Sequence, residues 1–495
     1  MKITVDGLDL SGAMINQLSI RRVLNEFDVL TMTVQLPHRI NVKRLVGAAV
    51  ACEIQGNERF RGFVHGLSMK AKRLSLRAWA YPGRLHLATR TNSYGGGSFE
   101  MPIHELQGID RLLKQVVGRE LLTTPVHVLF QHQETDWAVL QRVAALSHLI
   151  LFADSVSGTI RLKRPTDSRL RKIVPSFWTD EQSREEACLT ARVVECRSFN
   201  TRTGEFPSAT ARESADFSLP TEHTRGLGEF VVESNFPSSD GIVLSDKQQA
   251  RARLNSRLSK ASQWHGLVDD FDISVGDSLQ QPAELGEERL LIISSELKYN
   301  SRLPLRRQLY NRLSACDARF PPLASGNDSS IQSEYWGQVC DIEDPARQGR
   351  VKISLPWHKR PSADPKSWDG VWSRVGQMFA GQTEKGIRYG ALALPHPLDW
   401  GRIRFNPREF SLPWFEGASY TGHSTSPEAA SSFQEQLLFS FPGGPTFLVR
   451  HGEEARMLFA MRAPNGDDIC SIELSADGNI SIMGNIQIRK SGEKT

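Results

Sequence analysis

Apolar and polar residues alternate in two short runs within residues 335–357. The first run covers residues 338–342, and a polar segment with Asp344-Pro345 and Gly349 separates it from the second. The apolar positions of the second run are Val351, Ile353 and Leu355. A period of two places successive side chains on opposite faces of a strand. We therefore expect a hairpin that opens a small barrel, with one face buried and the other in water.

The same alternation predicts strands elsewhere in the chain. Residues 30–36 form a half-buried strand that stops at Pro37, and residues 47–64 give two strands joined by a polar turn at Gly56. Further strands are predicted at residues 190–199, 229–233, 290–299, 308–320, 371–376, 401–405, 436–440, 446–450 and 457–462. The predicted fold is therefore mainly β.

Apolar residues spaced three and four apart predict three helices. The first covers residues 101–117. The second begins after Thr135, a candidate N-cap, and precedes a strand at residues 149–152. Its apolar face consists of Trp137, Leu140, Val143 and Ala144. The third covers residues 244–264, with Gly266 as its expected stop, and buries Ala250, Leu254 and Leu258.

The C-terminal residues repeat with an eight-residue period. Ile472, Ile480 and Ile488 are eight residues apart, as are Leu474 and Ile482, while Gly478 and Gly484 stand at turn positions. One chain of such strands would leave open edges and an exposed apolar row. Wrapping copies around a threefold axis pairs the edges and turns the row inward, which predicts a homotrimer with these apolar residues in its core. The alternative is an ordinary meander that ends a monomeric β domain.

The hairpin also carries a longer motif, GxV followed after the Asp-Pro turn by GRVKISLPW. Its positions are Gly337, Val339, Gly349, Val351, Ile353, Pro356 and Trp357. This motif resembles the start of the oligomer-binding (OB) fold in VgrG-type spike proteins of contractile injection machines. The helix after Thr135 and the apolar strand that follows it are similar to a segment in the hub of that family. The eight-residue register resembles the intertwined β-helix of spike needles.

The resemblance implies a mainly β protein with an α+β hub. We expect a hub β-barrel domain at residues 1–95, the remainder of the hub with a second barrel-like domain at 96–322, an OB-fold domain at 333–420 and a needle base at 433–495. The hub barrels would be split, and the needle would be a short trimeric β-helix. Residues 321–330 and 421–432 are polar connectors.

The resemblance also implies a function. The chain would be the structural hub and puncturing spike of a contractile injection apparatus, either type VI secretion-like or an extracellular phage-tail-like particle. It would cap the inner tube and carry a tip or effector proteins through a target envelope. The expected partners are two further copies in a homotrimer, a hexameric inner tube protein, baseplate proteins, a PAAR-like tip protein and effector cargo.

Two other functions remain open on the sequence. One is a bacteriophage baseplate hub with a cell-wall-degrading role. The other is an OB-fold receptor for oligosaccharides or nucleic acid, because six of the ten tryptophans fall within residues 335–414 and could form a stacking platform. A compact barrel that uses large rings in its core and rim explains the same tryptophans.

Composition bears on the choice of partner and on the compartment in which the protein works. The 495 residues have room for roughly three or four domains, and 60 Lys and Arg against 56 Asp and Glu leave a net charge of +4, which does not favour nucleic acid as a partner. The six cysteines are scattered, which fits free thiols in a reducing compartment. The N-terminal residues and the lack of a long apolar stretch predict neither a signal peptide nor an integral membrane segment. We expect assembly in the cytoplasm and delivery outside the cell as part of a particle.

No arrangement of residues predicts catalysis. The chain lacks a zinc-protease motif, a phosphate-binding loop and a nucleophile elbow. His132, His148 and His396 are expected to be surface or packing histidines rather than metal ligands. We therefore expect a structural protein that is not an enzyme and has no cofactor and no metal site.

Overall fold

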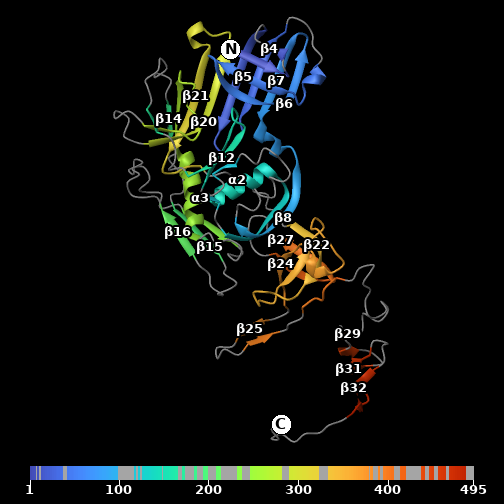
Figure 1. Cartoon of the computed structure of the whole chain (residues 1–495). Coiled ribbons are helices and arrows are strands. Elements are labelled where there is room, and N and C mark those ends of the chain that lie inside the picture. The colour runs from blue at the N-terminus through green and yellow to red at the C-terminus, as the bar shows by residue number, and fades with distance from the viewer. Residues whose placement is uncertain are drawn as a thin grey trace. The chain divides into compact units, whose positions relative to one another are not determined.

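The computed structural model describes most of the chain, with gaps. The described residues are 1–6, 8–10, 13–36, 42–98, 116–118, 121–122, 125–147, 149–164, 170–172, 183–186, 193–198, 208–212, 231–236, 246–280, 289–322, 333–377, 380–382, 388–390, 394–405, 413–419, 436–440, 445–450, 455–463 and 468–485. The chain divides into two compact units, Met1–Gly417 and Ala418–Thr495. The protein is mainly β, as the sequence predicted (Figure 1).

A large sheet, shaped as a half-barrel, forms the main part of the hub. Its strand order is β14-β18-β21-β20-β3-β4-β7-β6-β5-β1-β2, with β13 and β19 paired beside β20. The strands are β1 (Lys2–Val5), β2 (Leu8–Asp9), β3 (Met14–Val23), β4 (Val29–Gln35), β5 (Ala49–Ile54), β6 (Asn57–Lys70), β7 (Arg73–Ala80), β13 (Leu170–Lys172), β14 (Ser183–Glu186), β18 (Ser262–Val268), β19 (Ser278–Gln280), β20 (Arg289–Asn300) and β21 (Leu309–Asp317). Because β20 pairs with β3, strands from both predicted hub domains share this sheet.

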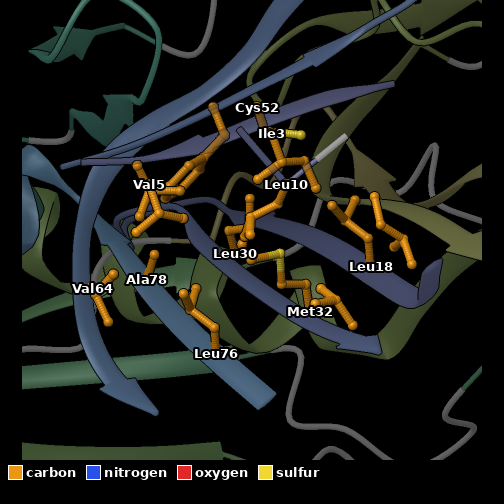
Figure 2. Close-up of a cluster of buried hydrophobic side chains, with 14 of the residues drawn as sticks. Ile3, Val5, Leu10, Leu18, Leu30, Met32, Cys52, Val64, Leu76 and Ala78 are labelled. Carbon is orange, nitrogen blue, oxygen red and sulfur yellow. The ribbon is translucent and has the colours of Figure 1, made fainter. Parts of the chain in front are cut away.

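Alternate residues of neighbouring strands form the hub core. Leu18 of β3, Leu30 and Met32 of β4 and Leu76 of β7 are buried together, and Figure 2 shows their side chains converging. The alternation that predicted a strand at residues 30–36 is thereby confirmed as β4. Gly62 lies where a Cβ atom would be 2.0 Å from the Trp79 carbonyl oxygen, so only glycine allows β6 and β7 to approach this closely.

Helix α2 (Asp136–Leu146) lies in a second layer with its own core. The Thr135 hydroxyl accepts a hydrogen bond from the Ala138 N–H at 3.2 Å, which confirms the predicted N-cap. The four predicted apolar residues of this helix are buried. The surrounding strands are β8 (Thr89–Ser98), β9 (Val116–Val117), β10 (Pro125–Thr135), β11 (Ile150–Asp154) and β12 (Thr159–Lys163). Strand β10 pairs with β8, and residues of both strands contact the barrel described below.

Helix α3 (Asp246–Ala261) packs on a small sheet of β15 (Val193–Ser198), β16 (Ser208–Arg212) and β17 (Val231–Phe236). Ala250, Leu254 and Leu258 are buried, as predicted. The predicted end of the helix was wrong. The chain becomes strand β18 at Ser262, because Trp264 pairs opposite Ala315 of β21 and is buried there, and Gly266 lies inside this strand.

The residues after 332 form a closed barrel of β22 (Ser333–Asp341), β23 (Val351–Ser354), β24 (Val371–Val375), β28 (Trp414–Ala418) and β27 (Trp400–Phe405). A short hairpin of β25 (Ala380–Gln382) and β26 (Arg388–Gly390) lies between β24 and β27 in the sequence. The predicted hairpin is confirmed as β22 and β23, although β22 begins earlier than residue 338. The described 3-10 turns include Val42–Leu45, Tyr81–His86, Leu305–Arg307 and Pro365–Ser367.

The second unit contains a five-stranded antiparallel meander. Its strands follow one another in order: β29 (Gln436–Ser440), β30 (Pro445–Arg450), β31 (Arg456–Arg462), β32 (Asp468–Ser475) and β33 (Ile480–Met483). The predicted connector at residues 421–432 lies outside the described residues, as do Ile488, most of the connector at 321–330 and all but the last two residues of the helix predicted at 101–117. Those two residues form strand β9.

Candidate assembly sites

The motif residues of the two barrel strands lie together in the barrel core. Val339, Val351 and Ile353 are fully buried, and Val339 pairs opposite Ile353. A Cβ atom on Gly337 would lie 2.5 Å from Ile353 Cγ2 and 2.7 Å from Ile403 Cδ1, so glycine is required there. Gly349 has φ +72°, a left-handed turn conformation that glycine adopts without strain. Pro356 is exposed, whereas Trp357 packs partly buried against the core.

The Asp-Pro turn of the motif is held by one ion pair. The Asp344 carboxylate accepts hydrogen bonds from the N–H groups of Ala346 and Gln348 and from the Arg350 guanidinium, the last at 2.7 Å. Partial burial alone would raise the pKa of Asp344, but the Arg350 guanidinium and the backbone donors outweigh it and hold that pKa well below its usual range. The pair therefore fixes the loop between β22 and β23.

A phenylalanine of the hub completes the barrel core. Phe130 lies on hub strand β10, yet it is buried among barrel residues. Its ring stacks on Phe405 with centroids 3.9 Å apart and meets the edge of Tyr335 at 5.6 Å. The hub and the barrel are thus joined by a shared apolar cluster.

Hydrogen bonds reinforce this contact. Ser93 lies opposite Phe130 on strand β8, and its Oγ lies 2.6 Å from His358 Nε2 and accepts a bond from Trp357 Nε1–H at 3.1 Å. A second histidine, His132 of β10, hydrogen-bonds through Nδ1 to the Tyr335 hydroxyl. We call the residues Ser93, Phe130, His132, Tyr335, Trp357 and His358 the joint.

The C-terminal meander has one apolar face. Two rows of directly paired residues cross all of its strands. One row is Phe439, Phe447, Phe459, Ile472 and Ile482, and the other is Leu437, Val449, Met457, Leu474 and Ile480. Eight of these ten side chains are 38 to 67% exposed. We call these two rows the apolar face.

The opposite face of the meander is mixed, because Leu448 and Leu458 are buried on it next to polar residues. Ser471, Glu473 and Ser481 point to that side, and Glu473 pairs with Arg456 at 3.5 Å. Gly478 and Gly484 have φ +84° and +123° at the turns where the sequence predicted them. Period-two alternation therefore divides this sheet into an apolar side and a side that mixes apolar and polar residues. The structure brings four of the five predicted core residues together on the apolar face: Ile472, Leu474, Ile480 and Ile482.

The described residues offer little chemistry. Within the described ranges, no three His, Cys, Asp or Glu side chains are grouped so that they could hold a metal ion. Burial raises the pKa of the Cys52 and Cys316 thiols to about 12 and that of Cys340 to about 11, so these thiols stay protonated. In the part of the chain that the structure describes, no helix is long and apolar enough to cross a membrane.

The barrel tryptophans serve different purposes. Trp368 is buried, and Trp357 belongs to the joint. Trp336 and Trp414 are 48% and 41% exposed, on the outside of the barrel. Arginine side chains lie over four of the rings: Arg360 over Trp368 and Trp400, Arg350 over Trp372 and Arg374 over Trp414. Contacts of this kind attract the guanidinium group to the face of the ring and help to hold these tryptophans in place.

Comparison with known proteins agrees with this architecture. No family model matches the chain. In sequence, the chain is 23% identical over 338 residues to the type VI secretion system spike protein VgrG3 of Vibrio cholerae, a match that covers 60% of this chain and 31% of the relative. The chain resembles VgrG-type spike proteins. It spans about a third of the length of this VgrG relative.

Solved structures show the same VgrG-like fold. A structure of a Francisella PdpA–VgrG complex, half-lidded, matches with a TM-score of 0.61 at 11% identity, covering 97% of this chain and 88% of that chain. The E. coli c3393 protein matches with a TM-score of 0.52 at 12% identity, covering 85% of this chain and all of the other. It is described as a type VI secretion component with structural similarity to the T4 bacteriophage tail proteins gp27 and gp5. The predicted hub and barrel architecture of a VgrG-like chain is therefore confirmed.

Sequence reasoning missed the joint. Nothing in the local pattern shows that Phe130 completes a barrel formed more than 200 residues later, or that Ser93 meets His358. The available signals were Trp357, the last residue of the VgrG-like motif, and His358, which directly follows it.

Proposed function

We propose that this chain is the structural hub and spike of a contractile injection apparatus and works as a homotrimer. The likeness to VgrG and to phage tail hub and spike proteins supports the role in such an apparatus. The observation that carries the trimer is the apolar face. In this proposal three copies bring their apolar faces together around a threefold axis.

Burial of the apolar face supplies the driving force. Fully burying a large apolar side chain contributes about 2 kcal/mol, and half of that area remains exposed in the single chain. Eight such side chains therefore contribute about 8 kcal/mol per copy, before the entropy cost of association is subtracted. An exposed sheet face of this size on a monomer would promote aggregation. Close packing of copies removes that hazard.

The remaining partners follow from the VgrG likeness alone. In this proposal the hub caps a hexameric inner tube protein and contacts baseplate proteins. A PAAR-like tip protein sits on the needle, and effector cargo travels with the spike through the target envelope. We also propose that the chain acts mechanically and not as an enzyme, with assembly in the cytoplasm before delivery outside the cell.

A pair of matched variants tests the trimer. Ile472→Asp places a charge on the apolar face, and Ser471→Asp places the same charge on the neighbouring residue of the opposite face. We expect light scattering to give three times 55.4 kDa for the native chain and for S471D, and the mass of one chain for I472D. A native chain that is monomeric or dimeric would contradict the trimer. Equal masses for the two variants would show that the apolar face does not hold the trimer together.

The same variants test the apparatus. In the producing cell, we expect S471D to support assembly of contractile sheaths and I472D to abolish it. Normal sheath assembly with I472D would contradict the spike role. A lytic band from the purified chain in a cell-wall zymogram would instead favour the cell-wall-degrading baseplate hub. Binding of oligosaccharides that is lost on replacing exposed Trp336 or Trp414 would favour the OB-fold receptor.

A further inference from the structure

Hydrogen bonds fix the protonation state of His358 at the joint. Its Nδ1 accepts the Leu355 backbone N–H at 3.0 Å, so this nitrogen carries no hydrogen. The hydrogen of the neutral ring is therefore on Nε2, which donates to Ser93 Oγ at 2.6 Å. One side of the ring is thus bound to the barrel turn and the other to hub strand β8.

A second proton is incompatible with this arrangement. Protonation would place a hydrogen on Nδ1, directly facing the Leu355 N–H. Two donors at hydrogen-bond distance repel each other, and the turn would lose its acceptor. The ring would have to rotate away, which also breaks its bond to Ser93. The charged imidazolium would further be confined in a largely buried contact.

The charged groups around the His358 ring do not stabilise its protonated form. Burial, together with nearby Lys352 and Arg360, lowers the pKa of His358 to about 4. Asp369 acts in the opposite direction but is outweighed. Ser93 is the hub residue that bonds the ring, and it is neutral.

The second histidine of the joint has the same preference. Tyr335 lies between His132 and Thr91, whose hydroxyl interacts with that of Tyr335. Burial lowers the pKa of His132, and Glu134 opposes this only in part. Both histidines of the joint are therefore neutral in the closed contact, and both favour its opening when they bind protons.

We propose that His358 is an acid-sensitive latch, which holds the barrel on hub strands β8 and β10 at neutral pH and releases it in acid. The latch is independent of the trimer, because all of its groups belong to one chain. On the proposed spike function, the barrel of the spike opens from its hub far more often in an acidic compartment than at neutral pH.

The expected size of the effect follows from linkage. A histidine with a lowered pKa in the closed joint stabilises it fully above the ordinary value of 6.5, and this stabilisation is lost as the pH falls toward 4. The open fraction of the joint should rise about 30-fold at pH 5 and approach roughly 300-fold below pH 4.

Hydrogen–deuterium exchange, followed by mass spectrometry on the full chain, tests the latch. After correction for the intrinsic pH dependence, we expect amides of β8 and of residues 355–358 to exchange faster at pH 5 than at pH 7. Amides of hub strands β4 and β7 should keep their protection. An unchanged joint at pH 5, or an equal rise in β4 and β7, would overturn the proposal.

Two variants separate the latch from general acid sensitivity. His358→Gln keeps a donor that reaches Ser93, and His358→Asn keeps an acceptor for Leu355, but neither titrates in this range. Each should show a much smaller exchange ratio between pH 5 and pH 7 at the joint than the native chain, because only His132 still titrates there. A rise in exchange at pH 5 as large as that of the native chain in both variants would overturn the latch. Exchange of the imidazole C2 hydrogen in the native chain gives a check that needs no variant: a pKa of His358 at or above 6.5 would also overturn it.

Discussion

Removing the Phe130 ring should weaken the barrel, although Phe130 belongs to a hub strand. The side chain is 4% exposed and stacks on Phe405, so Phe130→Ala leaves a cavity in the barrel core. Truncations of this kind cost about 3 to 5 kcal/mol. At the lower limit, the equilibrium constant for barrel opening rises roughly 150-fold. Phe130→Leu keeps most of the apolar volume and should cost about 1.5 kcal/mol.

Native-state hydrogen exchange measures where this free energy is lost. We expect amides of barrel strands β23 and β24 to lose protection in F130A by about 3 kcal/mol, and those of hub strands β4 and β7 to change little, because the hub core is a separate cluster. A loss under about 1 kcal/mol in the barrel would show that Phe130 does not complete its core. An equal loss in β4 and β7 would show that hub and barrel unfold as one unit.

Two further predictions concern buried carboxylates. Asp344→Asn should destabilise the barrel by about 3 kcal/mol in urea unfolding, because it leaves the largely buried Arg350 without its ion pair. Asp364→Asn, on an exposed loop, is the control and should change the unfolding free energy little. Equal effects of the two substitutions would contradict this prediction. Burial raises the pKa of Asp28 to about 6 against the opposing Arg22, so the contribution of Asp28 is present at low pH and is lost as the pH rises from 3.8 through 6. Relative to Asp28→Asn, the native chain should therefore lose about 2 to 3 kcal/mol of unfolding free energy between pH 4 and pH 7, and parallel pH profiles would contradict the assignment.

Local patterns were enough to predict many of the elements. Alternation with a period of two placed β4, β23 and the three strands β29 to β31, because the face of each side chain depends only on its position along the strand. Thr135 was predicted as an N-cap because capping involves residues that are neighbours in the sequence. Gly337 and Gly349 belonged to a motif whose spacing already implied a tight hairpin.

Predictions failed where distant segments compete for the same residues. Apolar spacing extended α3 to residue 264, but pairing with β21 turned Ser262–Val268 into a strand. Strand partners of this kind are about 50 residues apart in the sequence. Strands β3 and β20 are further apart: Ser19 and Glu296, whose side chains hydrogen-bond across them, are separated by 277 residues. Helical propensity is a small free energy per residue, and burial of a tryptophan in a sheet exceeds it.

The sequence by itself determined which residues of the C-terminal region are apolar and which side of each strand they occupy. Only the tertiary structure decided that β29 to β33 pair within one chain, so that ten apolar residues align in two rows across a single sheet. The same period of two is satisfied by pairing within a chain or between chains, because backbone hydrogen bonds are alike in both. The joint was likewise decided by the tertiary structure, since the contact of Ser93, Phe130 and His358 depends on how hub and barrel pack and not on their separation along the chain.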